Sequence, residues 1–228
     1  PNTTDASGKR YRFGNQPQIA LWNLARLAES LYPLIEKIEP LQEALTVYSD
    51  TFKQAYNEMM AGKLGLQSFD PAIDETLTDE LFQVLQLVET DMTIFYRLLA
   101  NVSKNDTEAE ALQKIMPAFY QPDELIEAVL ETWHFWLSLY LNSLQQETKS
   151  DNERKEGMNK VNPKYVLRNY MAQLAIEAAE KEDYSLISEL HEVLKNPYDE
   201  QPEAAKWFAK RPDWARTKVG CSMLSCSS

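Results

Sequence analysis

The sequence has little glycine, cysteine or histidine, and this scarcity argues against several common kinds of enzyme site. It contains 6 glycines, 2 cysteines and 2 histidines in 228 residues. Gly62 and Gly65 lie closest together, but they lack the flanking pattern of a phosphate-binding loop. Cys221 and Cys226 both fall near the end of the chain, so we expect a reducing compartment rather than a secreted disulfide framework. No run approaches the roughly 18 apolar residues of a membrane-spanning helix.

Basic residues are scarce relative to acidic ones. The formal net charge is −12, and residues 63–160 hold 18 acidic and 8 basic side chains. An acidic surface repels phosphate backbones, so we expect no nucleic-acid partner. The acidic stretch itself is typical of solvated helix faces. Because no apolar run is long enough to span a membrane, we also expect no membrane partner.

The beginning of the chain carries no targeting signal. Residue 1 is a proline rather than an initiator methionine, and no apolar signal segment follows it. We therefore expect a cut or processed end rather than a natural start of translation.

Helical periodicity begins after a short polar segment. Residues 1–16 are rich in turn-forming residues and predict an extended arm. Pro17 suits the first turn of a helix, and apolar residues recur at helical spacing from there until Pro33 kinks or ends the helix. Pro40 opens a second predicted helix that runs to about Met60.

Five further helices follow in the prediction. They cover a long helix capped by Thr78 that continues past Leu99, then residues 107–116, 122–146, 164–182 and 184–195. Residues 147–160 are charged and poor in apolar side chains, so we interpret them as a surface linker or a frayed helix. The last residues predict irregular structure apart from a turn at 203–209.

No segment shows the alternating pattern of a half-buried strand. The predicted fold class is therefore all-α, an irregular multi-helix bundle of about seven helices. The predicted organisation is an extended arm at 1–16, a helical domain at 17–200 and an irregular C-terminal tail at 201–228 with Cys221 and Cys226.

One pair of residues has the spacing of a metal site. Glu131 and His134 fit a carboxylate-bridged di-iron helix, but that site needs a second Glu-x-x-His and two further glutamates. The other histidine, His191, has Ser188 three residues before it. We therefore interpret His134 as a helix residue flanked by core aromatics, and we expect no metal bound by this segment.

Three polar residues interrupt an apolar helical pattern near the C-terminus. Arg168, Asn169 and Gln173 need hydrogen-bonding partners if they are buried. One interpretation is that they cap neighbouring helix ends and lock the bundle. The other is that they contact a substrate or nucleotide directly.

Three blocks of the sequence resemble one known family. Residues 11–28 read YRFGNQPQIALWNLARLA, residues 162–173 read NPKYVLRNYMAQ, and the chain closes with RPDWA at 211–215 and SCSS at 225–228. Each block is similar to a stretch of the selenoprotein O family, and the three occur in the family's order. The segment 63–160 resembles the family only in helical character.

The resemblance implies the C-terminal helical part of a protein-kinase-like C-lobe. The family transfers AMP from ATP to Ser, Thr or Tyr hydroxyls of target proteins, with ATP and Mg²⁺ or Mn²⁺ as cofactors. Its catalytic and metal-binding residues precede the stretch that resembles residue 1, so we expect no catalytic residue and no bound cofactor in this segment alone. The implied partners are a missing N-terminal catalytic part and protein substrates. The implied location is the bacterial cytoplasm or, in a eukaryote, the mitochondrion.

The same resemblance places the arm after the metal-binding aspartate of the family. Lys9, Arg10 and Arg12 then become candidates for contacts with phosphates or a protein substrate. The other interpretation is an ordinary exposed basic arm.

A terminal cysteine is the second candidate that the resemblance supplies. Some relatives carry selenocysteine where Cys226 stands, which implies a redox-responsive thiol; the other interpretation is an inert exposed cysteine. A Cys221–Cys226 disulfide is geometrically possible in a flexible tail. A tail-to-arm disulfide is in doubt, because residues 1–8 contain no cysteine.

The main alternative is a stand-alone α-helical protein-interaction module without catalytic activity. Part of a larger enzyme should expose an apolar patch where the missing part docks, whereas a self-sufficient module should be sealed on all sides. A third interpretation is a helical redox protein that acts through Cys221 and Cys226.

Overall fold

The computed structural model describes residues 8–218 and 221, and that part of the chain is helical without a named strand. Its α-helices are α1 (Gln16–Ile35), α2 (Glu39–Leu64), α3 (Pro71–Leu87), α4 (Met92–Leu99), α5 (Glu108–Ile115), α6 (Glu127–Gln146), α7 (Asp151–Val161), α8 (Asn169–Ala179) and α9 (Ser185–Lys195). Short 3₁₀ helices connect several of them, and one isolated bridge joins Thr90 to Phe119. The predicted class, an all-α irregular bundle, is confirmed.

The chain divides into two compact units. The first comprises residues 1–57 and 213–228, and the second comprises residues 58–212, so the division falls within α2. None of the helices described is long and apolar enough to cross a membrane.

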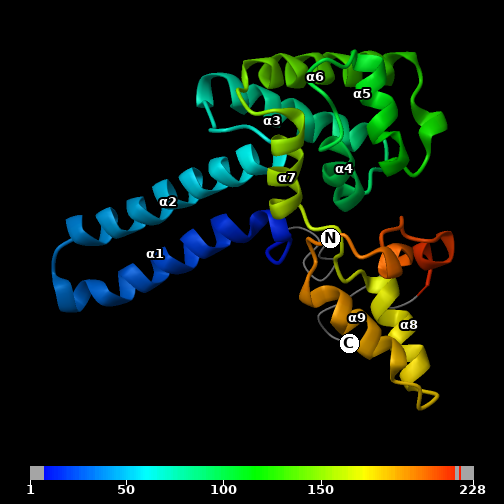
Figure 1. Cartoon of the computed structure of the whole chain (residues 1–228). Helices are drawn as coiled ribbons and strands as arrows, with labels where there is room; N and C mark the ends of the chain where they lie inside the picture. Colours follow the sequence, from blue (N-terminus) through cyan, green and yellow to red (C-terminus); the bar gives the residue numbers. More distant parts are fainter. Residues whose placement is uncertain (1–7, 219–220, 222–228) are drawn as a thin grey trace. The chain divides into compact units, whose positions relative to one another are not determined.

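The first unit is built on an antiparallel hairpin of α1 and α2 (Figure 1). Pro17 stands in the first turn of α1, as predicted, and its carbonyl accepts a hydrogen bond of 2.9 Å from the Tyr48 hydroxyl of α2. Pro33 lies inside α1, which ends two residues later. Glu36 then turns the chain in the left-handed region, and its N–H donates to the Tyr32 carbonyl at 2.8 Å.

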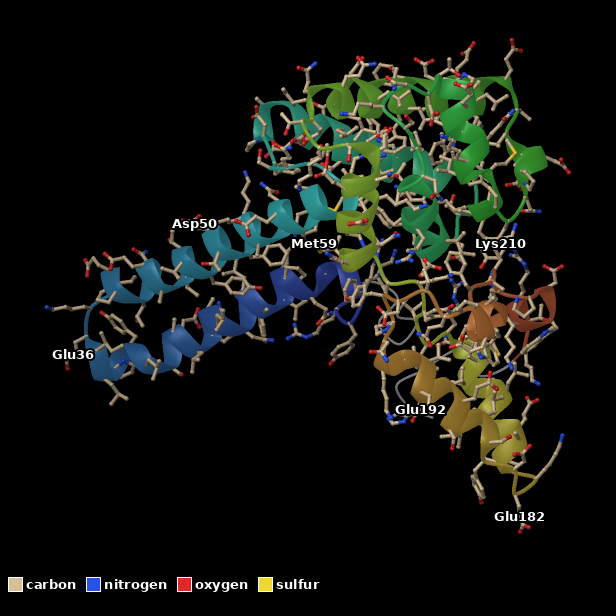
Figure 2. All side chains as sticks on the ribbon, viewed as in Figure 1. Glu36, Asp50, Met59, Glu182, Glu192 and Lys210 are labelled. Atoms are coloured by element: carbon tan, nitrogen blue, oxygen red, sulfur yellow. The ribbon has the colours of Figure 1, made fainter. Side chains whose placement is uncertain are left out.

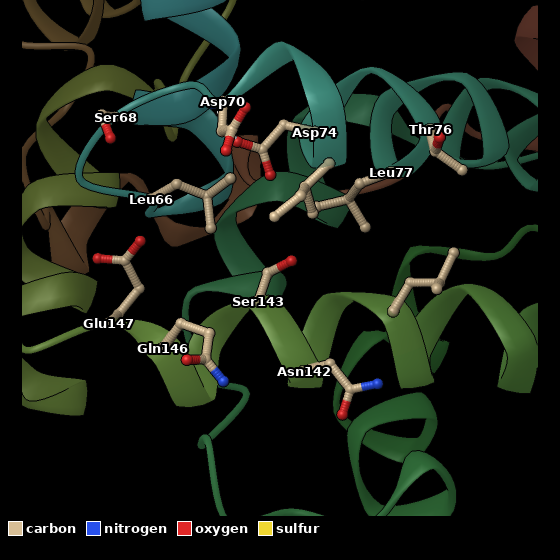
Figure 3. Close-up of a pocket in the computed structure, with 12 residues that line it drawn as sticks. Leu66, Ser68, Asp70, Asp74, Thr76, Leu77, Asn142, Ser143, Gln146 and Glu147 are labelled. Carbon is tan, nitrogen blue, oxygen red and sulfur yellow. Dashed lines mark hydrogen bonds between the residues drawn. The ribbon is translucent and has the colours of Figure 1, made fainter.

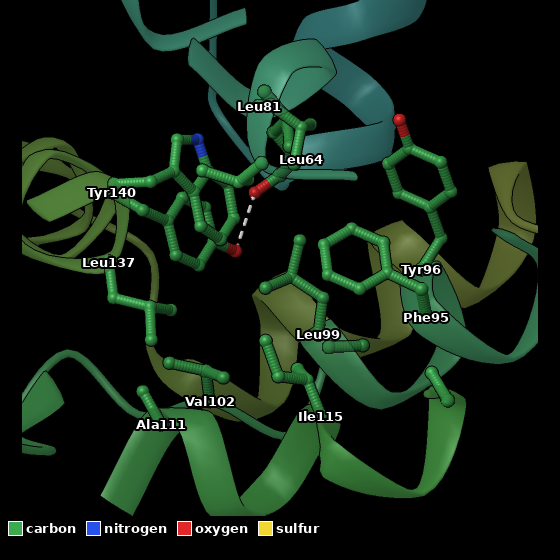
Figure 4. Close-up of a cluster of buried hydrophobic side chains, with 14 of the residues drawn as sticks. Leu64, Leu81, Phe95, Tyr96, Leu99, Val102, Ala111, Ile115, Leu137 and Tyr140 are labelled. Atoms are coloured by element: carbon green, nitrogen blue, oxygen red, sulfur yellow. Dashed lines mark hydrogen bonds between the residues drawn. The ribbon is translucent and has the colours of Figure 1, made fainter. Parts of the chain in front are cut away.

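The second unit contains the main hydrophobic core, in which aromatic side chains of α4 and α6 meet (Figure 4). Trp136 and Tyr140 of α6 stack at 5.4 Å between ring centroids, and Phe95 of α4 lies 6.1 Å from Trp136. The polar ends of these rings are satisfied, because the Trp136 indole N–H donates to the Leu77 carbonyl at 3.0 Å and the Tyr140 hydroxyl donates to the Leu64 carbonyl at 2.9 Å. The aromatic face predicted for residues 122–146 therefore forms this core, although its α-helix begins at Glu127.

The prediction of one long helix starting at Thr78 is wrong, because two helices, α3 and α4, occupy this region. α3 begins at Pro71, where the Asp70 carboxylate caps it by accepting from the Ala72 N–H at 3.0 Å, and Thr78 lies within it. α3 ends at Leu87 and Val88 is extended. Asp91 then caps α4 by accepting from the Ile94 N–H at 3.1 Å. An aspartate at the N-cap followed by a proline in the first turn, as at Asp70 and Pro71, is a common helix start.

Of the two alternatives predicted for 147–160, the linker is wrong, because α7 occupies residues 151–161. The segment is helical, and its start is capped rather than frayed. A capping box begins it: the Ser150 hydroxyl accepts from the Glu153 N–H, and the Glu153 carboxylate accepts from the Ser150 N–H at 2.9 Å. Arg154 and Met158 are the buried residues of this charged helix. Two inward positions are thus enough to fix a helix whose composition alone predicts solvent exposure.

Smaller differences concern the C-terminal helices. The helix predicted at 164–182 begins only at Asn169, because Tyr165 and the residues around it are held by the segment near Pro197 through backbone hydrogen bonds. The turn predicted at 203–209 coincides with a 3₁₀ helix at Pro202–Trp207.

Candidate functional site

The residues of the second resembling block meet distant segments of the second unit and hold them together. Arg168 binds both carboxylate oxygens of Asp91, with its Nη2 at 2.8 Å from Oδ1. Asp91 is only 4% exposed and caps α4 at the same time. The Tyr120 hydroxyl donates to Asp91 Oδ2 at 3.2 Å. We call Asp91, Tyr120 and Arg168 the Asp91 cluster.

The electrostatics of the Asp91 cluster favour a structural role. Burial alone would lower the pKa of Arg168, but the hydrogen bond and the charge of Asp91 outweigh it and raise that pKa. Burial also raises the pKa of Tyr120 above its usual value. Arg168 therefore stays charged and Tyr120 stays protonated at neutral pH, so neither is poised for proton transfer.

The start of the same block connects α7 to α2 and to the segment after α9. The Asn162 amide donates to the Lys63 carbonyl at 3.0 Å, and its oxygen accepts from the Lys63 ammonium at 3.0 Å. Lys164 pairs with the Glu200 carboxylate, and the Tyr165 hydroxyl donates to the Gln201 carbonyl at 2.9 Å. The block from Asn162 to Arg168 is thus an internal clamp, which we call the 162–168 clamp.

Arg97 of α4 completes the connections around this clamp. Its Nη1 donates to the carbonyls of Asn159, Asn162 and Tyr198 at 3.1–3.2 Å, and its Nη2 pairs with Glu200. A single buried guanidinium therefore satisfies three carbonyl groups, one of them in α7. Composition does not reveal such a role, because it depends on contacts more than sixty residues apart.

The structure supports the first interpretation for Arg168. Arg168 pairs with the residue that caps α4, which locks two elements of the bundle together. Gln173 donates to Glu177 at 2.9 Å within α8. His134, the metal candidate that the sequence disfavours, is partly exposed and lies between the buried Trp133 and the exposed Phe135.

A pocket of about 530 Å³ lies between the start of α3 and the end of α6 in the second unit (Figure 3). Its wall includes the carboxylates of Asp70, Asp74 and Glu147, beside the apolar Leu66 and Leu77. Burial raises the pKa of Asp74, and the charges of Asp70 and Glu147 raise it further, while a hydrogen bond from the Asp70 N–H opposes this. Among residues 8–218 and 221, no group of three His, Cys, Asp or Glu side chains is arranged to hold a metal ion.

The basic arm lies against the start of α1 in the first unit. Arg10 donates to the Asn23 side chain at 3.1 Å, and its guanidinium lies 4.6 Å from the Trp22 ring centre. The Gln16 amide binds the carbonyls of Arg10 and Arg12 at 2.9 and 3.0 Å. These contacts fix the backbone of the arm.

The basic side chains of the arm differ in exposure. Lys9 has a positive φ of 48° and its carbonyl accepts from the Asn15 amide at 3.0 Å. Lys9 and Arg12 are exposed, whereas Arg10 is partly buried. The arm therefore presents two cations to solvent from a backbone held by side-chain amides, which is compatible with both interpretations of it.

Of the two cysteines, only Cys221 is among the residues that the structure describes. Cys221 is buried at 5% exposure, and its N–H donates to the Lys218 carbonyl at 3.1 Å. Cys226 lies outside the described residues. The redox role of both thiols stays a prediction.

These observations define a class. Within the described part of the chain, the largely buried side chains of Arg97 and Arg168 pair with Glu200 and Asp91, which lie far from them in sequence. The class that they define is an all-α region in which buried arginines hold separate segments of the second unit together.

Comparison with known proteins identifies the family. The model of the family described as protein adenylyltransferase SelO matches residues 1–195. The chain is 58% identical over 228 residues to a protein nucleotidyltransferase YdiU of Flavobacterium johnsoniae, 49% over 238 residues to one of Rhodopirellula baltica, and 49% over 228 residues to one of Aromatoleum aromaticum. The chain therefore belongs to the SelO family of protein adenylyltransferases.

The relatives are much longer than this chain. Each of the three covers all of it, yet the chain spans only 44%, 44% and 43% of their respective lengths. The resemblance to the selenoprotein O family that three sequence blocks indicate is thus confirmed over the whole chain, including the middle segment.

Proposed function

We propose that this chain is the C-terminal helical region of a protein adenylyltransferase. The whole enzyme would transfer AMP from ATP to Ser, Thr or Tyr hydroxyls of target proteins, using Mg²⁺ or Mn²⁺ to bridge the phosphates. The observation that carries the proposal is the family match over residues 1–195, together with relatives that are more than twice as long. In this proposal the catalytic and metal-binding residues lie upstream, and the helices form the base of a protein-kinase-like C-lobe.

The exposed apolar surface of the first unit supports a docking role for the α1–α2 hairpin. α1 has no buried residue in this structure, although it is strongly apolar. Leu34 is 82% exposed and Val47 is 65% exposed. Further exposed apolar side chains that the two helices contribute to the first unit are Trp22, Leu27, Leu31, Tyr32, Ile35, Phe52 and Tyr56. Large exposed patches of this kind mark interaction sites, which argues against a stand-alone module that is sealed on all sides.

The basic arm is the part of this chain that we assign to the substrate side. Lys9, Arg10 and Arg12 would contact nucleotide phosphates or a protein substrate, since arginine and lysine form strong charge-assisted hydrogen bonds with phosphate oxygens. The fixed backbone at Arg10 and Arg12 supports this assignment, because a held arm loses less conformational freedom on binding.

AMP transfer onto a protein substrate tests the proposal. We expect no labelling of protein by the 228-residue chain incubated with ATP labelled on the α-phosphate and Mg²⁺ or Mn²⁺. The longer protein that includes the upstream region should label protein under the same conditions. Robust labelling by the short chain would overturn the assignment of the chemistry to the upstream part.

Substitutions in the arm of the longer protein test the substrate-side role. The Arg12→Met variant should lower AMP transfer about tenfold or more, because it removes a charge-assisted contact. Arg26→Met is the matched control, since Arg26 pairs with Glu29 on the exposed side of α1 at 2.6 Å. Equal activity of both variants would contradict a role for the arm in binding phosphate or substrate.

We also propose that Cys226 is the redox-responsive thiol, and that Cys221 is a structural one. Burial of Cys221 excludes reagents from its sulfur. In the Cys226→Ser variant, the remaining thiol should react slowly with a thiol reagent in the folded chain and rapidly after unfolding in urea. In the Cys221→Ser variant the remaining thiol should react rapidly in both states. Fast reaction of the Cys226→Ser variant before unfolding would show that Cys221 is accessible.

A further inference from the structure

An apolar groove runs between α8 and α9 in the second unit. Its volume is about 620 Å³. Ala175 and Leu190 form the buried floor, and Ile176 and Ile187 line it while remaining about half exposed. The groove exists because α8 places alanine at 172, 175 and 179, three positions on one helical face that lack a long side chain.

The hairpin that forms the groove is acidic in sequence. Residues 169–195 carry six carboxylates and two ammonium groups, a formal charge of −4 with His191 neutral, although Glu189 pairs with Lys206 and Glu192 pairs with Lys195. Glu180 lines the groove directly after the last residue of α8, and Figure 2 shows Glu182 at the far tip of the α8–α9 hairpin and Glu192 along α9. The carboxylate of Glu180 therefore favours a cation at this end of the groove.

We propose that the groove between α8 and α9 binds a basic amphipathic helix of another protein. Helices of this kind lay an apolar face into a hydrophobic groove through side chains at i, i+3 or i+4, and i+7. Leucine-sized side chains fit above the alanine positions of α8, while lysine or arginine at the edges of the helix meets the acidic surroundings. The proposal does not depend on AMP transfer.

Charge also decides against two other occupants. A second copy of this chain would bring an equally acidic hairpin against the groove, and like charges repel at such an interface. An anionic lipid surface is repelled for the same reason. A basic helix is the occupant that satisfies both the apolar groove and its acidic surroundings.

Fluorescence anisotropy with a designed peptide tests the proposal directly. The probe is a labelled peptide of leucine and lysine arranged with helical periodicity, and its counterpart carries glutamate in place of every lysine. We expect the lysine peptide to bind the 228-residue chain and the glutamate peptide not to bind. Equal binding of both peptides, or binding of neither, would overturn the proposal.

Variants of the groove locate the binding site. Ile176→Ser should weaken binding of the lysine peptide about tenfold, because it removes a large apolar contact. Ile73→Ser is the matched control: Ile73 lies inside α3, is 60% exposed against 52% for Ile176, and does not line the groove. Ala179→Leu should weaken binding by filling the groove, and Glu180→Lys should weaken it by reversing a charge. Unchanged binding in all three groove variants would place the peptide elsewhere.

Two further measurements keep the result interpretable. Far-ultraviolet circular dichroism of Ile176→Ser must match that of the unsubstituted chain, and the variant must remain folded at the temperature of the binding measurement, so that loss of binding does not reflect unfolding. Sedimentation of the chain alone should show no self-association that Ile176→Ser abolishes. A dimer that this variant dissociates would assign the groove to a second copy and overturn the proposal.

Discussion

At the scale of single residues, the buried pair of Asp91 and Arg168 is the contact whose loss should cost most. The Asp91 side chain is 1% exposed, so removing Arg168 leaves a buried carboxylate without its counter-charge. The Arg168→Met variant should lose about 3–5 kcal/mol of unfolding free energy. Urea unfolding followed by near-ultraviolet circular dichroism measures this loss.

Arg26→Met is the control for that prediction, because the Arg26–Glu29 pair is more than half exposed on both sides. Its loss should cost about 0–1 kcal/mol. The double variant Arg168→Met with Asp91→Asn should recover part of the lost stability, since the buried charge is then gone as well. A loss in Arg168→Met no larger than that in Arg26→Met would contradict the structural role of the Asp91 cluster.

The raised pKa of Asp74 predicts how the stability of the folded chain depends on pH. Burial raises its pKa in the folded chain, so the folded state binds a proton more tightly than the unfolded state does. Stability from this group therefore falls as pH rises from the unfolded pKa of about 3.8 through the folded pKa, and the ionised carboxylate costs stability at pH 7. The Asp74→Asn variant removes that cost.

Thermal melting of Asp74→Asn checks this sign. The variant should melt on the order of 1 °C above the parent at pH 7, and the difference should disappear below about pH 4. Asp70→Asn is not an equivalent control, because Asp70 caps α3 through the Ala72 N–H. Asp79→Asn serves instead, since Asp79 lies on α3 away from the pocket. A variant that melts lower at pH 7 and equal at pH 4 would contradict the raised pKa.

At the scale of helices, Gly65 determines how α2 ends. It has a φ of +78°, and an added Cβ would lie 2.7 Å from Arg154 Cγ and from Met158 Sδ. Gly65→Ala should therefore cost about 1–2 kcal/mol from the backbone alone, with a further cost from moving buried α7 side chains. Chemical denaturation measures the total loss of unfolding free energy from both causes.

Gly62, three residues earlier and inside α2, is the matched control for this prediction. An added Cβ at Gly62 meets only Val161 at 3.7–3.8 Å, which is ordinary contact. Gly62→Ala should be neutral or stabilise by about 0.5–1 kcal/mol, because alanine favours helix. Equal losses at both positions would show that the conformation at Gly65 is not the cause.

Helix starts show what local sequence can predict. The capping box of Ser150 and Glu153 and the Asp70-Pro71 pair are both readable as helix starts, and attention to them corrects two of the misassigned boundaries. The break between α3 and α4 is different in kind. The chain leaves the helix at 88–91, where Thr90 pairs with Phe119 and Asp91 pairs with Arg168, and both partners are remote in sequence.

At the scale of the whole molecule, the α1–α2 hairpin should bind apolar dyes. Replacing Leu34 by Gln together with Val47 by Thr should lower the fluorescence of bound anilinonaphthalene sulfonate and leave stability within about 0.5 kcal/mol, because both side chains are exposed. The control pair is Ile73→Gln with Ile126→Gln, two exposed isoleucines of the second unit. The two substitutions in the α1–α2 hairpin should lower the dye fluorescence more than the control pair does. Equal effects of the two pairs would contradict a concentrated patch on the hairpin.

The sequence by itself determined the all-α class, most helix positions and the family. Helical periodicity and the three blocks that occur in the family's order are local properties of the chain, so they can be recognised without the tertiary structure. The sequence indicated that Arg168 would lock the bundle, but it did not predict the partners of the 162–168 clamp, the role of Arg97 or the groove between α8 and α9. Those depend on which buried carbonyls and carboxylates meet a guanidinium across tens of residues, and on where small side chains leave space between packed helices. Tertiary structure decided them, since a buried charge is tolerated only where packing brings its partner.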